Sequence, residues 1–97
     1  MAEHSDLLAE ALDSLKTGGF ELGPNWDRAH EIAQDHEGNA DFDWLHALCH
    51  RIEGDDWNAG YWYRRAGRER GQDTVEEEWT RMRAAFSGAM QSIRKEE

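Results

Sequence analysis

Cysteine and long apolar runs are both nearly absent from this chain. Cys49 is the only cysteine, so no disulfide can form within the chain, and a reducing compartment is expected. The first ten residues, MAEHSDLLAE, have no basic region and no long apolar run, so they do not resemble a signal peptide. No segment approaches the roughly 18 consecutive apolar residues of a membrane helix. The sequence therefore predicts a cytoplasmic protein that has no membrane partner.

Basic residues are scarce as well. The 97 residues include 11 Lys and Arg against 21 Asp and Glu, which gives a formal net charge of −10. This charge disfavours binding to nucleic acid or to an anionic membrane through a broad surface, and we predict no nucleic-acid partner. Four arginines are nevertheless grouped in the segment RRAGRER, residues 64–70. We favour their pairing with acids of the same fold, and a local anion site is the alternative.

The sequence also has few signals for β-structure. Pro24 is the only proline, and no segment shows convincing alternation of apolar and polar residues. Five tryptophans argue against disorder, because each can bury a large area, and the length suits one modest core. The sequence therefore predicts an all-α fold over residues 1–97, a single small domain of about five helices. A central hairpin of the third and fourth helices is expected, with a long C-terminal helix.

Cap and turn residues mark the ends of the first three expected helices. Ser5 is a suitable N-cap for the first helix, which ends near Lys16 before a pair of glycines. The second begins at Pro24, a residue that suits the first helical turn. The third is expected to start with Asp41 or Asp43 as its cap. It should stop at the EGDD break, residues 53–56.

The last two helices have similar boundary signals. The fourth is expected from Asp56 to Ala66, before Gly67. Thr74 and Glu77 form a capping box at the start of the fifth, which should continue to about Arg94.

A heptad-like apolar seam runs along the expected fifth helix. It predicts either a long helix that lies across the bundle, which we favour, or a homodimer through the C-terminal helix. The seam consists of Val75, Trp79, Met82, Phe86, Ala89 and Ile93.

The densest chemistry lies in residues 44–67, WLHALCHRIEGDDWNAGYWYRRAG. Helical spacing places His46, His50 and Glu53 in one narrow stripe beside the apolar face of the third helix, a half-buried position. Glu53 lies in the last turn, where the helix dipole disfavours a carboxylate, so it should have a cationic partner. His30 lies on the apolar side of the second helix and can point into the same space.

The expected fourth helix has aromatic side chains on two faces, which predicts that it is sandwiched or lines a cavity. Gly60 in its middle suggests a close helix crossing or a ligand. A short turn at Gly54 should place this helix beside the histidine stripe. The sequence therefore predicts a pocket for a small polar or anionic ligand. Its candidate ligand-binding residues are His30, His46, His50, Glu53, Asn58, Trp62 and Arg65.

Three histidines and a carboxylate also raise the possibility of zinc. Two histidines four residues apart are workable ligand spacing, but Ala47 stands where the zincin motif has its catalytic Glu. Histidines bonded to carboxylates and backbone are the commoner arrangement, so the sequence favours no metal and no cofactor. Two further hypotheses stay open. One is a scaffold protein in which the motif is a structural polar network, and the other is an enzyme that uses His46, His50 and Glu53.

The runs WDRAHEIAQ and WLHALCHRIEGDDWNAGYWYRRAG resemble a family of small, uncharacterised microbial helical proteins. The resemblance covers about residues 26–67 and implies that His30 belongs with the central cluster. It implies no activity. The matching positions are Trp26, His30, Trp44, His46, His50, Arg51, Glu53, Asp55, Asn58, Tyr61, Trp62, Arg64 and Arg65.

Overall fold

The third of five helices occupies the centre of this protein. The computed structural model describes the backbone of residues 4–95 and the side chains of residues 4–87, and within these ranges it contains helices and no strands. The all-α prediction is therefore confirmed. The helices are α1 (His4–Thr17), α2 (Pro24–Gln34), α3 (Ala40–Glu53), α4 (Asp56–Arg65) and α5 (Val75–Lys95).

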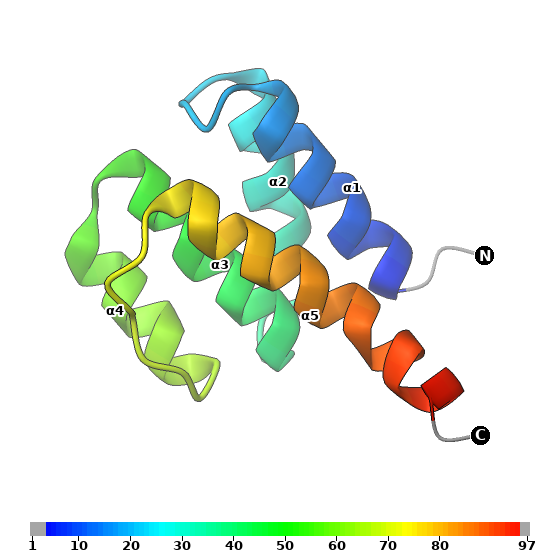
Figure 1. Cartoon of the computed structure of the whole chain (residues 1–97). Coiled ribbons are helices and arrows are strands. Elements are labelled where there is room, and N and C mark those ends of the chain that lie inside the picture. The colour runs from blue at the N-terminus through cyan, green and yellow to red at the C-terminus, as the bar shows by residue number, and fades with distance from the viewer. Residues whose placement is uncertain (1–3, 96–97) are drawn as a thin grey trace.

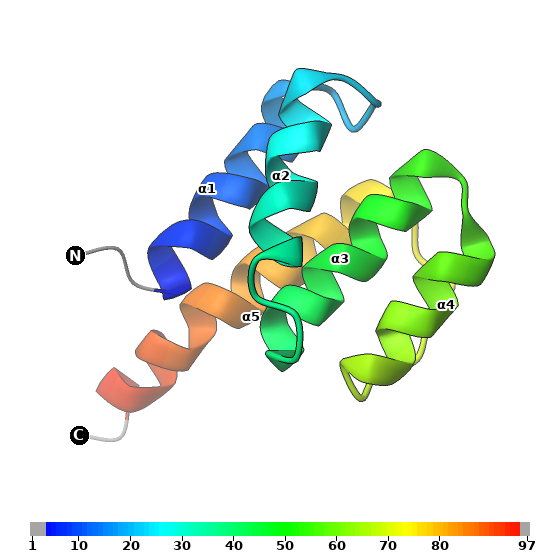
Figure 2. The same ribbon diagram turned by 180° about the vertical axis from the view of Figure 1, so that it is seen from behind.

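Two helical pairs and one long helix make up the arrangement (Figure 1). α1 packs beside α2, and α3 forms the predicted tight hairpin with α4. α5 lies across α3 and α1 on one face, and its last turns extend beyond the body. From behind, α2 and α3 lie side by side, with α4 on the outer flank (Figure 2). α3 therefore contacts α2, α4 and α5 at once.

All nine residues of α3 from Phe42 to His50 are buried, although they include an aspartate and two histidines. The sequence had suggested that the histidine stripe would be half-buried. That prediction was wrong for His46 and His50, because three other helices surround α3 and these two residues are buried. Glu53, the third residue of the stripe, is exposed. A polar side chain on this helix must find its partners inside the protein.

Two helix starts differ from the prediction. The N-cap of α3 is Asn39, whose side chain accepts hydrogen bonds from the backbone N–H groups of Asp41 and Phe42, so neither Asp41 nor Asp43 is the cap. α1 already includes Ser5, since it begins at His4. The Thr74–Glu77 capping box is confirmed by two reciprocal bonds of 2.9 and 3.1 Å.

The turn between α3 and α4 follows from two residues. Gly54 adopts φ = 87°, a left-handed conformation that glycine allows without strain, and it ends α3. Asp55 then caps α4 by accepting a hydrogen bond from the Asn58 N–H. This two-residue connection fixes α4 directly beside the C-terminal half of α3.

α4 is not sandwiched, contrary to the prediction. Ala59, Trp62 and Tyr63 are buried against the rest of the protein, but Trp57 is 76 % exposed and Tyr61 is 37 % exposed. Gly60 marks no close helix crossing either, because a Cβ placed there would meet only the Arg64 side chain, at 3.5 Å.

The apolar seam of α5 packs into the core of the same chain. Trp79 and Met82 are buried, and Val75 and Phe86 pack against the core. This is the arrangement of a long helix lying across the bundle. Ala89 and Ile93 lie outside the described side chains.

Among the described residues, none of the helices has the length and apolarity needed to span a membrane.

Candidate functional site

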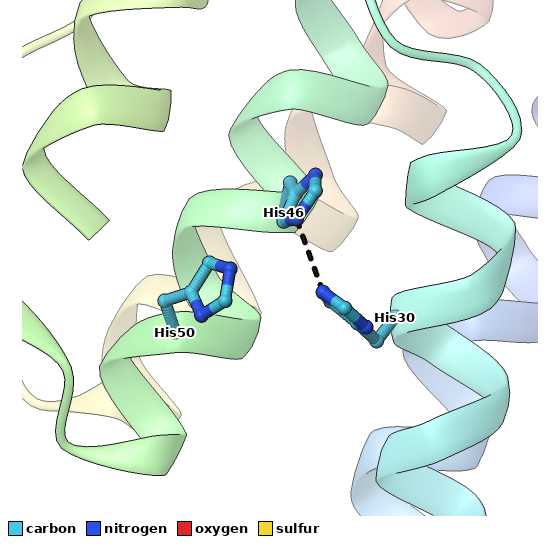
Figure 3. A group of neighbouring side chains, drawn as sticks. All are labelled: His30, His46 and His50. Carbon is cyan, nitrogen blue, oxygen red and sulfur yellow. Dashed lines mark hydrogen bonds between the residues drawn. The ribbon is translucent and has the colours of Figure 1, made fainter. Parts of the chain in front are cut away.

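Three histidines from two helices converge at the α2–α3 interface (Figure 3). His46 and His50 are one turn apart on α3, and His30 reaches them from α2. The Nε2 atoms of His30 and His46 are 3.1 Å apart. One ring nitrogen from each of the three histidines lies within 4.8 Å of the others. The structure therefore joins His30 to the predicted stripe, and we call these three residues the histidine cluster.

Tryptophan rings hold two of the three imidazoles in place. Trp26 stacks on His30 with ring centroids 4.7 Å apart, and Trp62 stacks on His46 at 3.9 Å. The Trp26 indole also donates a hydrogen bond of 2.8 Å to the Cys49 carbonyl, which ties α2 to α3. Because these contacts restrict ring rotation, the cluster nitrogens are aimed at one another by packing.

Burial keeps part of this cluster neutral. The pKa of His46 is lowered to about 3, first by burial and then by the neighbouring His30 and His50. Burial and the charge of His50 also lower the pKa of His30. A neutral imidazole retains a lone pair on one nitrogen, which is the form that binds metal ions.

Glu53, at the C-terminal end of α3, has a hydrogen-bond donor in His50. His50 Nδ1 and Glu53 Oε1 are 2.7 Å apart, so the histidine donates to the carboxylate. The second nitrogen of His50, Nε2, is thereby left on the side of His46 and His30 (Figure 3). Asp55 lies at the outer edge of the same group, with a carboxylate oxygen within 4.8 Å of ligand atoms of His50 and Glu53.

The other predicted site residues do not converge as free polar groups. Asn58 binds Asp55 through both its backbone and its side chain. Arg65 donates to the Tyr61 hydroxyl and lies over the Trp62 ring at 5.2 Å. Of Asn58, Trp62 and Arg65, only Trp62 touches the histidine cluster, through its face.

Three of the four arginines in residues 64–70 have partners, and these partners are of two kinds. Arg70 pairs with Asp56 at 3.0 Å, as the favoured prediction requires. Arg65 and Arg68 instead lie over aromatic rings, with the Arg68 guanidinium carbon 3.5 Å from the centroid of Trp44. The prediction that this group pairs with acids therefore applies to Arg70 and not to Arg65 or Arg68.

Two clefts among the described side chains share Ser5 of α1 and Phe86 of α5 as lining residues. The second cleft also reaches Asp41 of α3 and Arg68, which follows α4. Neither includes any of the seven residues predicted to bind a ligand.

A buried carboxylate on α5 escaped the sequence reasoning. Glu78 is 1 % exposed and accepts hydrogen bonds from the Tyr63 hydroxyl, the Trp44 indole and the Arg51 guanidinium. Burial, followed by the bond to Glu78, raises the pKa of Tyr63. Glu78 is one of three consecutive acids in the first turn of α5. Its spacing from Val75 and Met82 puts it on the apolar face and could have revealed it.

Asp43 is the second buried acid that sequence reasoning did not single out for the site. It is 1 % exposed, and its Oδ1 accepts a hydrogen bond of 3.2 Å from the Gly38 N–H. It had been considered only as a helix cap.

Comparison with family models, with curated proteins and with solved structures finds no match to this chain. The resemblance over residues 26–67 therefore stays a prediction.

Proposed function

We propose that this protein binds one divalent transition-metal ion at His30, His46 and His50. The observation that carries the proposal is the convergence of three imidazole nitrogens within 4.8 Å. In a tetrahedral site with metal–nitrogen bonds of about 2.0–2.1 Å, ligand nitrogens are roughly 3.3 Å apart. The 3.1 Å between His30 Nε2 and His46 Nε2 is close to that spacing.

The donor atoms suggest which metal is bound. Imidazole suits zinc, copper(II) and nickel, whereas calcium and magnesium prefer sets of oxygen ligands. Cys49 offers no competing thiolate, because its side chain is buried and burial raises its pKa. A site of three imidazoles also leaves a fourth position for water or another ligand.

The hydrogen bond between His50 and Glu53 also supports a metal site. Metal-binding histidines usually donate their other ring N–H to a carboxylate or a carbonyl, which orients the ring and raises its basicity. His50 has this arrangement already, with Nδ1 on Glu53 and Nε2 on the side of the other two histidines.

A small polar or anionic ligand, which the sequence favoured, has weaker support. Asn58 and Arg65 form hydrogen bonds to Asp55 and Tyr61, and neither cleft is lined by a residue of the histidine cluster. We therefore place the metal ion ahead of the organic ligand as the occupant of this site.

A calorimetric titration of metal-free protein with zinc tests the proposal. We expect saturable binding of one ion per chain, with no comparable binding of magnesium or calcium. Zinc present at a hundred times its dissociation constant should stabilise the fold by about 2.7 kcal/mol.

Two histidine variants make the test specific. His46→Gln removes a ligand and should lower the zinc affinity at least tenfold. His4→Gln changes an exposed histidine on α1 outside the cluster and should leave the affinity unchanged. Absence of saturable zinc binding, or equal affinity in His46→Gln and the wild type, would refute the proposal.

A further inference from the structure

One nitrogen atom of the histidine cluster and one oxygen atom of a residue three positions before it are buried. Neither atom has a hydrogen-bond partner within the described structure. They are Nδ1 of His46 and Oδ2 of Asp43. Their residues are 2 % and 1 % exposed, so solvent outside the protein does not satisfy them. Buried polar groups without hydrogen bonds are rare, and these two are complementary, because an imidazole N–H donates and a carboxylate accepts.

Asp43 and His46 occupy neighbouring positions on one face of α3. Asp43 precedes His46 by three residues, so both lie on the same face of the helix. Helical side chains lean toward the N-terminus, which inclines the His46 ring toward Asp43. Figure 3 shows the second ring nitrogen of His46 pointing away from His30, toward the preceding turn.

Arg65 and Asp43 interact electrostatically. The pKa of Arg65 is raised first by its bond to Tyr61, and further by the negative charge of Asp43. The Arg65 guanidinium lies over Trp62, whose ring also stacks on His46. Arg65 is therefore linked to both residues, to Asp43 by charge and to His46 through the Trp62 ring.

We infer that Asp43 is a positioning residue for the metal site, a step that rests on the proposed function. Its Oδ2 and His46 Nδ1 make no direct hydrogen bond, and one water molecule bridges them by accepting from Nδ1–H and donating to Oδ2. This contact holds His46 in the tautomer whose Nε2 lone pair faces His30 and His50. Asp43 then does for His46 what Glu53 does for His50, so carboxylates three residues away orient two of the three ligands.

The inferred contact with Asp43 determines which ring nitrogens of His46 and His30 carry protons before metal binds. With its proton on Nδ1, His46 Nε2 accepts the 3.1 Å hydrogen bond, and His30 Nε2–H is the donor. When metal binds, His30 must release that proton from Nε2 and carry one on Nδ1 instead. His30 is only partly buried, so solvent can mediate the exchange.

Asp43→Asn is the decisive variant because it keeps the shape of the side chain. Its amide oxygen can still accept the hydrogen bond from the Gly38 N–H. Its amide nitrogen can only donate, so it favours a lone pair on His46 Nδ1 and moves the His46 proton to Nε2, where it competes with metal. Asp41→Asn, an exposed position on the same helix, is the matched control.

Two measurements test the inference. Nitrogen-15 NMR of the imidazole rings in the metal-free wild type should place the His46 proton on Nδ1, and Asp43→Asn should shift it to Nε2. Zinc calorimetry should show an affinity about 10- to 100-fold lower for Asp43→Asn, and unchanged for Asp41→Asn.

The outcomes separate this inference from the proposed function. If the wild type binds zinc but Asp43→Asn binds it with an affinity within threefold of the wild type, Asp43 does not position His46. A His46 proton found on Nε2 in the metal-free wild type would also overturn the inference, and this measurement needs no variant to fold. Absence of zinc binding by the wild type refutes the proposed function itself. In that case the NMR result shows only which ring nitrogen of His46 carries the proton.

Discussion

At the residue scale, Gly60 offers a direct test of the α4 environment. Glycine in a helix interior costs about 1 kcal/mol relative to alanine. An added Cβ would contact only the end of the Arg64 side chain, at an ordinary 3.5 Å. Gly60→Ala should therefore raise the free energy of unfolding by up to about 1 kcal/mol in urea denaturation. A loss of stability would show that this position needs the space.

The histidine cluster predicts how stability depends on pH. Native His46 has a pKa of about 3, whereas an unfolded histidine has a pKa of about 6.5. Between these values the unfolded chain binds more protons, so the free energy of unfolding should fall as pH decreases from about 6.5. The slope from His46 should stay below about 1.4 kcal/mol per pH unit, because the unfolded state binds at most one more proton at this residue than the folded state.

Urea denaturation of metal-free protein between pH 6.5 and 5 measures this slope before most carboxylates titrate. His46→Gln should flatten it, and His4→Gln should not. Stability that stays constant over this range would contradict the neutral state of the buried His46.

Sequence reasoning identified the three histidines and Glu53 but misjudged their surroundings. Helical spacing placed His46, His50 and Glu53 on one stripe, and that stripe exists. The spacing could not show that Trp62 covers His46 or that His46 is buried, because both depend on how α4 packs against α3. Asn58 and Arg65 were assigned to the pocket by proximity in the chain, but both bind neighbours on their own helix or its cap.

At the element scale, Glu78 connects three helices. Its carboxylate lies on α5 and accepts hydrogen bonds from Arg51 and Trp44 on α3 and from Tyr63 on α4. Arg51 also donates to the Asp73 carbonyl, just before α5 begins. The network therefore holds α5 across the central hairpin, and it leaves the buried carboxylate with several donors.

Glu78→Gln should be strongly destabilising. The variant leaves the Arg51 guanidinium in the interior without its counter-charge, and breaking a buried ion pair in this way typically costs about 3–5 kcal/mol. Urea denaturation measures the loss, and Glu76→Gln, an exposed position in the same helical turn, should cost less than about 0.5 kcal/mol. Equal stability of the two variants would show that the network contributes little.

Helix boundaries were predicted better than helix environments. Gly54 and the Thr74–Glu77 box act within a few residues of chain, so local sequence was sufficient to place them. The exposure of Trp57 and the burial of Asp43 depend on which faces the other helices cover. Such tertiary contacts leave little trace in local spacing, and for that reason α4 was wrongly predicted to be sandwiched.

At the scale of the whole molecule, the seam of α5 bears on self-association. Trp79 and Met82 are buried and Phe86 is partly buried in the core of the same chain, so these residues cannot also form a dimer seam without opening the fold. We therefore expect a monomer in light scattering at high protein concentration. We also expect Phe86→Asp to lower stability rather than to change the molecular mass. A concentration-dependent dimer that Phe86→Asp disrupts would instead support the homodimer.

The central claim concerns a metal ion at the contact between α2 and α3. A crystal structure of the zinc-soaked protein, with anomalous scattering recorded at the zinc absorption edge, tests it most directly. The account predicts one strong anomalous peak about 2.0–2.1 Å from Nε2 of His30, His46 and His50. A zinc peak only at other residues, such as the exposed His4, or no peak at the three histidines would contradict it.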